Sequence, residues 1–470
     1  MTRAQGTVAL LAAALALPLA TGAASAREGV AALQAHQEPR GIGNLVVPGD
    51  SVRIGYTIDT RGVRSPSGSL FVRSNRERSF VRVPLNLRRG PQLWATVPQR
   101  LVHGRELRYY AVLRDGAGRS LTLPAAGAQG PSVARVLADA RIVRLGVHRF
   151  GRTRGADAVV ARAGPDIVGY QAPLPGEFPG FGPQTFLVGR DGSVWIHDGV
   201  NQRLLVFRRG APDTVARSLA LPFAVTFNDV ALGPAGSVYV VRGVGRGLEH
   251  HYVLDRLSAT GEVLWETRLA GELTDASSFV LGANRSLRTG PDGTLYCLAG
   301  MPGRVGGEQG WMPVATPAGR PLTVAQQVRG TRWPYQPVRG GLRLISELKP
   351  RGELAPREAR FALVDRRGRV VRSWRVLSGT DVTFGYTTPE LVGGDPVVVL
   401  HVTKLAGDHF DWEYLVLRLG PRGVRARFSL RRAFWGDQLL PDVRTGPDGR
   451  VYQLVSSPET GIRVLRYAVG

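Results

Sequence analysis

The sequence predicts a nearly all-β protein, an N-terminal β-sandwich followed by a six-bladed β-propeller. Three observations predict this fold. The 470 residues include 60 glycines and 32 prolines, which favours many short strands joined by turns. Residues 51–123 contain short runs with a period of two, as half-buried strands do. From about residue 180 onward, a strand–turn–strand unit repeats.

The first 26 residues have the pattern of a signal peptide. Arg3 supplies positive charge, residues 8–20 are apolar, and Ala24-Ser25-Ala26 offers a small-x-small cleavage site. The apolar run is shorter than the roughly 20 residues that a membrane-spanning helix needs. We therefore expect cleavage before Arg27 and a periplasmic or extracellular protein that does not span the membrane.

Residues 27–42 are polar and without period, which predicts a linker, and residues 43–126 are predicted to form the sandwich. In Ser51–Asp59, apolar residues alternate with polar or small ones. Similar runs follow at Ser69–Arg73, Phe80–Leu85, Leu93–Val97, Leu107–Arg114 and Leu121–Leu123. The segment Tyr109–Gly118 resembles the penultimate strand and turn of bacterial immunoglobulin-like and fibronectin-type modules.

Residues 127–470 are predicted to form the propeller. The turn glycines of the repeat lie 44 residues apart (192 to 236), then 57 (236 to 293), and the 156 residues from 293 to 449 allow three steps of 52. Two hairpins per repeat make a four-stranded blade. The clear copies are Phe186–Ile196, Val230–Val240, Leu287–Tyr296 and Val443–Tyr452, and degenerate copies lie at Gly341–Val376 and Pro396–Leu430.

The last blade lacks its outermost strand, because the chain ends at Gly470. An unpaired strand edge invites aggregation, so another segment should cover it. We expect residues 141–163 to close this blade by pairing with Ile462–Tyr467, from either Arg141–His148 or Asp157–Ala163.

The first repeat carries a family resemblance. Gly176-Glu177-Phe178, Pro183 and the segment Asp198–Arg203 look like the G-E/Q-F lead-in, proline and D-x-x-N-x-R element of the NHL repeat. The later copies keep the Asp-Gly turn but lack that element, and Arg242 stands where Asp198 would align. The resemblance implies a six-bladed propeller that serves as a rigid ring presenting loops.

A formal net charge of +24 does not by itself predict nucleic-acid binding. The only lysines are Lys349 and Lys404, so nearly every cation is an arginine, which is typical of compositional bias. The arginines are spread through strands instead of gathering in one block between exposed aromatics. We expect no dedicated nucleic-acid surface, although a basic field can attract anionic envelope polymers. Cys297 is the only cysteine, and its apolar surroundings predict a buried thiol.

The loop before each innermost strand of a propeller faces one mouth of the central channel. Aligning the repeats on their turn glycines brings Gln184-Thr185, Asn228-Asp229, Arg285-Ser286 and Pro441-Asp442 to equivalent places. Gln184, Asn228, Asp229 and Asp442 are therefore predicted ligand-binding residues. The side-chain oxygens of Asn and Asp also suit a divalent cation. The alternative is that these residues only form turns, as Asn and Asp often do.

The segment Asn228–Pro234 resembles the N-D-x-x-x-x-P segment of the gluconolactonase family, six-bladed hydrolases with an axial divalent metal. The resemblance implies Asn228 as a metal ligand and Asp442 as an acid/base group. That family also needs a glutamate in its first blade. Here Glu177 fits the NHL lead-in, and Gln184 holds the channel position.

The sequence contains no G-x-S-x-G, no H-E-x-x-H and no Cys/His cluster. We therefore expect a binding or scaffold protein without a catalytic set or cofactor. A metal-dependent hydrolase or lyase acting at the channel mouth is the alternative.

Residues 300–340 are predicted to form one long loop that carries Trp311, Trp333 and Tyr335. Long loops on rigid scaffolds often bind ligands. Because exposed aromatic rings suit sugars and peptides, these three residues are predicted to contact a protein, peptide or glycan.

Overall fold

A computed structural model gives the fold. It describes residues 32–38, 42–60, 63–151, 153–164, 166–172, 180–183, 185–223, 229–245, 251–270, 286–290, 292–300, 309–331, 336–338, 342–349, 356–379, 383–387, 390–406, 409–431 and 442–470. Predicted features that lie outside these residues are the signal peptide, the lead-in 176–178, Gln184, Asn228, Trp333 and Tyr335.

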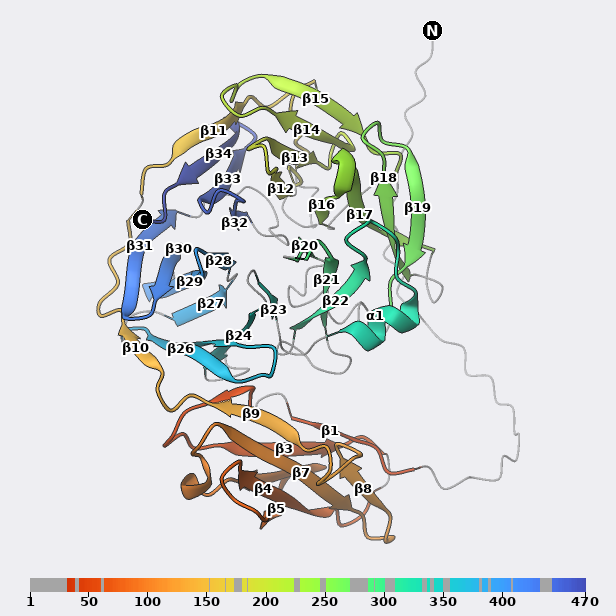
Figure 1. Ribbon diagram of the computed structural model, residues 1–470, viewed down its shortest axis with the longest axis vertical. Helices are drawn as coiled ribbons and strands as arrows, with labels where there is room; N and C mark the ends of the chain where they lie inside the picture. Colours follow the sequence, from red (N-terminus) through yellow and green to blue (C-terminus); the bar gives the residue numbers. More distant parts are fainter. Residues whose placement is uncertain are drawn as a thin grey trace, which may run out of the picture.

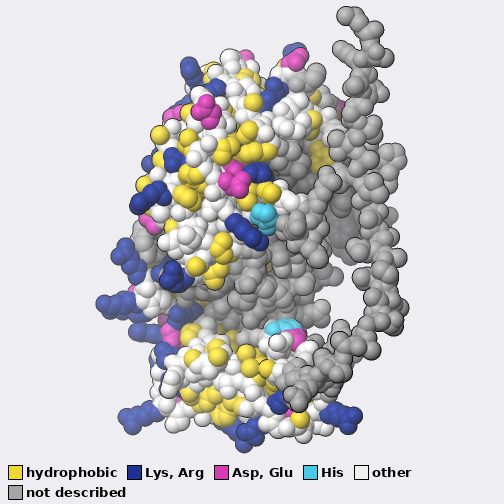
Figure 2. Space-filling model, turned by 90° about the vertical axis from the view of Figure 1, so that its right-hand side faces the viewer, with side chains coloured by type: hydrophobic (Ala, Val, Ile, Leu, Met, Phe, Trp, Pro, Cys, Tyr) yellow, Lys and Arg dark blue, Asp and Glu magenta, His cyan; other side chains and the backbone are white. Residues whose placement is uncertain are grey.

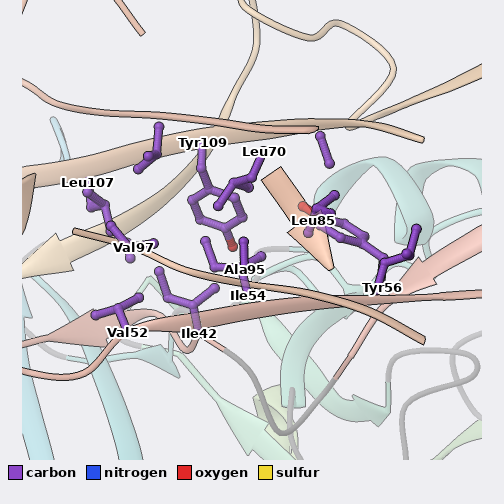
Figure 3. Close-up of a cluster of buried hydrophobic side chains, with 14 of the residues drawn as sticks. Ile42, Val52, Ile54, Tyr56, Leu70, Leu85, Ala95, Val97, Leu107 and Tyr109 are labelled. Carbon is purple, nitrogen blue, oxygen red and sulfur yellow. The ribbon is translucent and has the colours of Figure 1, made fainter. Parts of the chain in front are cut away.

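The first part of the chain forms a nine-stranded sheet with the order β1-β3-β6-β5-β4-β7-β9-β2, in which β8 also pairs with β7. Apolar and polar residues alternate along its strands, so that one face of the sheet is buried. In β7, for example, every second residue from Leu107 to Leu113 is buried. Ile54, Leu70 and Tyr109 from three strands meet in one core (Figure 3). The strands are β1 (Ala35–Gln37), β2 (Leu45–Val46), β3 (Arg53–Ile58), β4 (Ser67–Ser74), β5 (Val81–Arg89), β6 (Gln92–Thr96), β7 (Glu106–Arg114), β8 (Ser120–Leu123) and β9 (Ser132–Val136).

The predicted period-two strands of this part are present, and the sheet includes further residues on both sides of them. The expected linker 27–42 contains β1, and its Leu33 and Ile42 are buried in the core of the sheet. Residues after 126 also join the sheet. β9 pairs with β7 and buries Ala134 and Val136 in that core.

The rest of the chain is a six-bladed β-propeller, drawn as a ring in Figure 1. Neighbouring blades pack through shared apolar cores. For example, Leu204 and Val240 share the core between blades 1 and 2. Blades 1 to 3 comprise β12 (Thr185–Val188), β13 (Val194–Asp198), β14 (Arg203–Phe207), β15 (Val215–Ala220); β16 (Val230–Leu232), β17 (Val238–Val244), β18 (His251–Leu257), β19 (Val263–Arg268); and β20 (Leu287–Thr289), β21 (Leu295–Gly300), β22 (Gln309–Ala315), followed by α1 (Val324–Gly330).

Blades 4 and 5 correspond to the two degenerate repeats, and blade 6 corresponds to the last clear copy. Blade 5 carries a short extra strand, β28, beside β29. The strands are β23 (Gln336–Pro337), β24 (Arg343–Lys349), β25 (Glu358–Val364), β26 (Val370–Leu377); β27 (Thr383–Thr387), β28 (Glu390–Val392), β29 (Asp395–Ala406), β30 (His409–Gly420), β31 (Gly423–Arg431); and β32 (Val443–Thr445), β33 (Val451–Ser457), β34 (Gly461–Tyr467).

The sixth blade takes its outermost strand from the segment before the repeats. β11 (Ala156–Ala161) pairs antiparallel with β34, so that Ala161 lies opposite Ile462. β10 (Arg141–Arg144) goes elsewhere and pairs parallel with β26 of blade 4 (Figure 1). The two halves of the predicted closing segment therefore pair with different blades.

The chain between β10 and β11 is held by buried hydrogen bonds to Glu413. His148 bonds through Nε2 to Glu413 on β30, and both side chains are nearly inaccessible to solvent. The second oxygen of Glu413 accepts a hydrogen bond from Gly151 N at 3.0 Å.

The turn glycines of the four clear repeats all have a positive φ, as the repeat predicts. Their φ values are 80° at Gly192, 73° at Gly236, 84° at Gly293 and 75° at Gly449. The repeat alignment is thus confirmed at the level of backbone conformation.

The NHL-like segment of blade 1 forms one local network. Asp198 Oδ2 accepts hydrogen bonds from Asn201 Nδ2 at 2.8 Å and Arg203 Nε at 3.1 Å. Asp198 Oδ1 accepts from Gly169 N at 3.1 Å, which ties the preceding segment to the blade. In blade 2 the charges are exchanged, since Arg242 on β17 donates to Asp255 on β18 at 2.7 Å. Blade 2 therefore has an arginine–aspartate ion pair between its second and third strands although it lacks the motif. The family resemblance itself stays a prediction.

The N-terminal sheet docks on blade 4. Leu45 N donates to Glu347 Oε2 at 3.0 Å, and Arg360 donates to Leu45 O at 3.1 Å and to Asp50 Oδ1 at 3.1 Å. An apolar cluster joins the two parts beside these bonds. Its buried members are Leu45, Val47, Leu137, Ile345, Ala362 and Val364.

Basic side chains are spread over the surface from the propeller to the N-terminal sheet, as Figure 2 shows for one face. Several arginines are already paired with carboxylates of this chain, such as Arg203 with Asp198 and Arg463 with Asp157. Cys297 is buried, as expected. Within the described ranges, no helix is long and apolar enough to cross a membrane.

Candidate functional site at the channel mouth

Four blades place a polar residue at the same position, immediately before or at the start of the innermost strand. The four side chains are all buried, with exposed fractions between 0% and 7%. They are Thr185, Asp229, Ser286 and Asp442. Because these strands start at one end of the ring, the four residues share one mouth of the channel.

Asp229 is the centre of this arrangement. Its Oδ1 accepts hydrogen bonds from Val230 N at 2.9 Å and Arg444 Nη2 at 2.8 Å. Its Oδ2 accepts from Leu287 N at 2.9 Å and from the same Arg444 nitrogen at 2.9 Å. Arg444 Nη2 also donates to Thr185 Oγ1 at 2.9 Å. Asp229 and Arg444 together therefore connect blades 1, 2, 3 and 6.

Asp442 joins blades 5 and 6. Its Oδ2 accepts a hydrogen bond from the hydroxyl of Tyr414, on β30 of blade 5, at 2.8 Å. Both the carboxylate and the tyrosine ring are buried. The predicted acid/base residue thus lies in a contact between blades 5 and 6.

A second ion pair connects non-adjacent blades near the centre of the ring. Arg288 on β20 of blade 3 bonds to Glu390 on β28 of blade 5. The guanidinium of Arg288 also lies 5.7 Å from the centre of the Trp311 ring, a cation–π distance. Together with Arg444–Asp229, this pair places two arginines at the channel.

His197 lies beside the mouth on β13, directly opposite Thr185. Its side chain is fully buried, and neither ring nitrogen has a hydrogen-bond partner among the described residues. Burial lowers the pKa of His197 to about 4, so the ring is neutral at pH 7.

The expected long loop 300–340 is not a single loop, because β22 and α1 occupy much of it. Trp311 lies in β22 and is half-buried, while its neighbours Met312 and Val314 pack in the core between blades 2 and 3. The helix begins with a capping box between Thr323 and Gln326. Pro313 and the flanking glycines conceal the strand in the sequence.

The described channel residues do not fit the divalent metal that the gluconolactonase resemblance implies. The guanidinium of Arg444 already bonds to both oxygens of Asp229. Its positive charge therefore occupies the place beside the carboxylate that a metal ion would take. No group of three or more His, Cys, Asp or Glu side chains among the described residues could hold a metal ion.

Arg288, Arg444 and His197 are parts of this site that sequence reasoning missed. The repeat alignment contains a signal for the arginines. Both stand five residues before a turn glycine, where blades 1 and 2 have Leu187 and Ala231. A charged residue at a position that is otherwise apolar marks a special contact.

No protein-family model and no curated protein matches the chain. Among solved structures, it is similar to the PQQ-bound form of aldose sugar dehydrogenase from Streptomyces coelicolor, with a TM-score of 0.33 and 12% identity over 66% of this chain and 96% of that one. It is also similar to endo-arabinase from Bacteroides thetaiotaomicron, with a TM-score of 0.30 and 11% identity over 64% of this chain and 98% of that one. At such low scores these likenesses carry no argument about activity or ligand.

Proposed function

We propose that the protein is an exported, non-catalytic β-propeller of the cell envelope or extracellular medium, which presents its loops to a glycan, peptide or protein ligand. One observation supports this role above all. The two described carboxylates predicted for the channel mouth hold blades together, since Asp229 bonds to Arg444 and Asp442 bonds to Tyr414. A rigid, cross-linked ring suits the presentation of loops.

Hydrolysis by a lactonase-type site needs a free acid/base carboxylate and an open metal position. Asp442, the acid/base group that the resemblance implies, accepts a hydrogen bond from Tyr414. Asp229 at the channel mouth has four hydrogen-bond contacts, which fill the usual acceptor capacity of a carboxylate. The binding role requires neither group to be free, and it is therefore preferred to the hydrolase.

The test combines metal analysis, lactone hydrolysis and glycan-array binding on the purified mature chain. We expect no stoichiometric divalent metal, no hydrolysis of gluconolactone above the buffer rate, and selective binding to a ligand that is recovered unchanged. Asp442→Asn should lower the thermal midpoint, because it weakens the contact with Tyr414. A bound metal together with lactone turnover that Asp442→Asn abolishes would establish the hydrolase instead.

A further inference from the structure

A cavity of about 230 Å³ lies between blades 1 and 6, away from the channel mouth. Two turns of blade 1, residues 189–192 and 209–212, form one wall, and β11 and blade 6 form the other. These turns follow the ends of β12 and β14, so the cavity opens at the end of the ring opposite to Asp229 and Asp442. We call it the seam pocket.

Three arginines line the seam pocket, Arg190, Arg209 and Arg466. Arg190 and Arg209 are exposed and form no ion pair or hydrogen bond within the described part of the chain. Arg466 lies beside the hydroxyl of Tyr452. The stem of Arg209 lies across the turn at Gly192, with its Cδ 2.9 Å from where a Cβ of residue 192 would be.

The two carboxylates that also line the pocket already have hydrogen-bond donors. Asp157 accepts hydrogen bonds from Arg463 at 2.6, 2.8 and 2.9 Å. Asp448 accepts from the hydroxyl of Tyr452 at 2.9 Å and from Arg450 N at 3.1 Å. The three lining arginines therefore form no ion pair with either of these carboxylates, and the local excess of positive charge attracts an anion.

The size and chemistry of the pocket narrow the class of ligand. A guanidinium fork matches a carboxylate or phosphate group in two parallel hydrogen bonds. The cavity volume is about that of eight water molecules in the liquid, at roughly 30 Å³ each. That is room for one sugar-sized unit, and it is less than the roughly 300 Å³ at which drug-sized pockets begin.

We propose that the seam pocket binds the carboxylate or phosphate group of one sugar unit in an anionic polysaccharide. The N-terminal sheet leaves the pocket accessible, because that sheet docks on blade 4, across the ring from β11, β34 and β15 in Figure 1. The site is separate from the channel mouth and extends the proposed function to a second surface.

The experiment measures binding to the full mature chain by calorimetry. The probes are a galacturonic acid trimer, glucose 6-phosphate and neutral maltotriose. Both charged probes should bind and maltotriose should not, and the tighter of the two identifies the source of the anion. Arg209→Gln should weaken binding on the order of tenfold, as expected when one charge-assisted hydrogen bond is lost.

Arg208→Gln is the matched control, because Arg208 is an exposed neighbour outside the pocket and its loss changes the net charge equally. This variant should bind as the parent does. If Arg209→Gln fails to fold, Arg190→Gln replaces it, with the same expectation. Equal weakening by Arg208→Gln, or no binding of either charged probe, would overturn the pocket. If the seam pocket fails this test but the protein still binds a ligand elsewhere, such as at the channel mouth, the proposed function remains valid without the pocket.

Discussion

Gly192 shows how one residue of the repeat is fixed by backbone geometry and by its neighbour. Its φ of 80° is strained for a side chain, and a Cβ there would lie 2.9 Å from Arg209 Cδ. We expect Gly192→Val to lower the free energy of unfolding by about 1–3 kcal/mol, measured by denaturant titration. Gly151→Ala is the control, since a Cβ at residue 151 would have no atom within 4 Å and the φ of Gly151 is not left-handed. Equal effects of the two changes would contradict the strain at Gly192.

His197 makes the stability of the fold depend on pH. Its pKa in the folded chain is about 4, below the ordinary value of 6.5, because burial disfavours the charged ring. The unfolded chain therefore binds the extra proton first as the pH falls. The stabilisation is complete above pH 6.5 and decreases between pH 6.5 and 4, by up to about 3 kcal/mol.

His197→Leu should remove this pH dependence, because a leucine of similar size has no proton to bind. We expect the denaturant midpoint of the parent to fall more steeply from pH 7 to pH 4.5 than that of the variant. Parallel curves for the two proteins would mean that His197 does not titrate on unfolding.

At the scale of elements, β11 is the strand on which closure of the ring depends. Val159 is fully buried in the core shared by blades 1 and 6, whereas Val160 next to it is 37% exposed. Val159→Asp should therefore destabilise the protein by several kcal/mol and promote aggregation through the freed edge of β34. Val160→Asp places the same charge on the outer face and should change stability by less than about 1 kcal/mol. Thermal unfolding with light scattering measures both effects, and equal behaviour would argue against closure by β11.

Elements with a strong local pattern could be predicted from the sequence, and elements with a weak one could not. β7 alternates over its whole length, and Gly192 and Gly449 mark turns that need a positive φ. β1 has three residues, and its place in the sheet depends on pairing with β3, which is distant in the sequence. The period-two pattern of β22 is interrupted by Pro313.

The site was predicted only in part, for a similar reason. The repeat alignment brought Asp229 and Asp442 to one end of the ring, because it needs only the spacing of the turns. The partners Arg444 and Tyr414 come from other blades. Their contacts depend on how the blades are arranged around the ring, which spacing within one repeat does not contain.

On the scale of the whole molecule, the N-terminal sheet and the propeller are coupled. The apolar cluster around Leu45 and Ile345 spans both parts, and the chain continues from β9 into β10, which pairs within blade 4. Arg360 strengthens this contact from blade 4, since its side chain is only 4% exposed and bonds to Asp50 of the N-terminal part. We therefore expect the mature chain to unfold in one cooperative transition.

Arg360→Met tests this coupling because it keeps the bulk of the side chain and removes its charge. The bonds to Leu45 O and Asp50 are lost, while Glu358 keeps its partner Arg375 at 2.7 Å. Loss of a buried pair of this kind should cost on the order of 3 kcal/mol and separate the transition into two in differential scanning calorimetry. The control is Arg369→Met, whose ion pair with Asp365 involves a 59% exposed arginine and should be worth less than about 1 kcal/mol. If Arg360→Met melts as the control does, in one transition at the same temperature, the apolar cluster and the bond from Leu45 N to Glu347 hold the two parts together without Arg360.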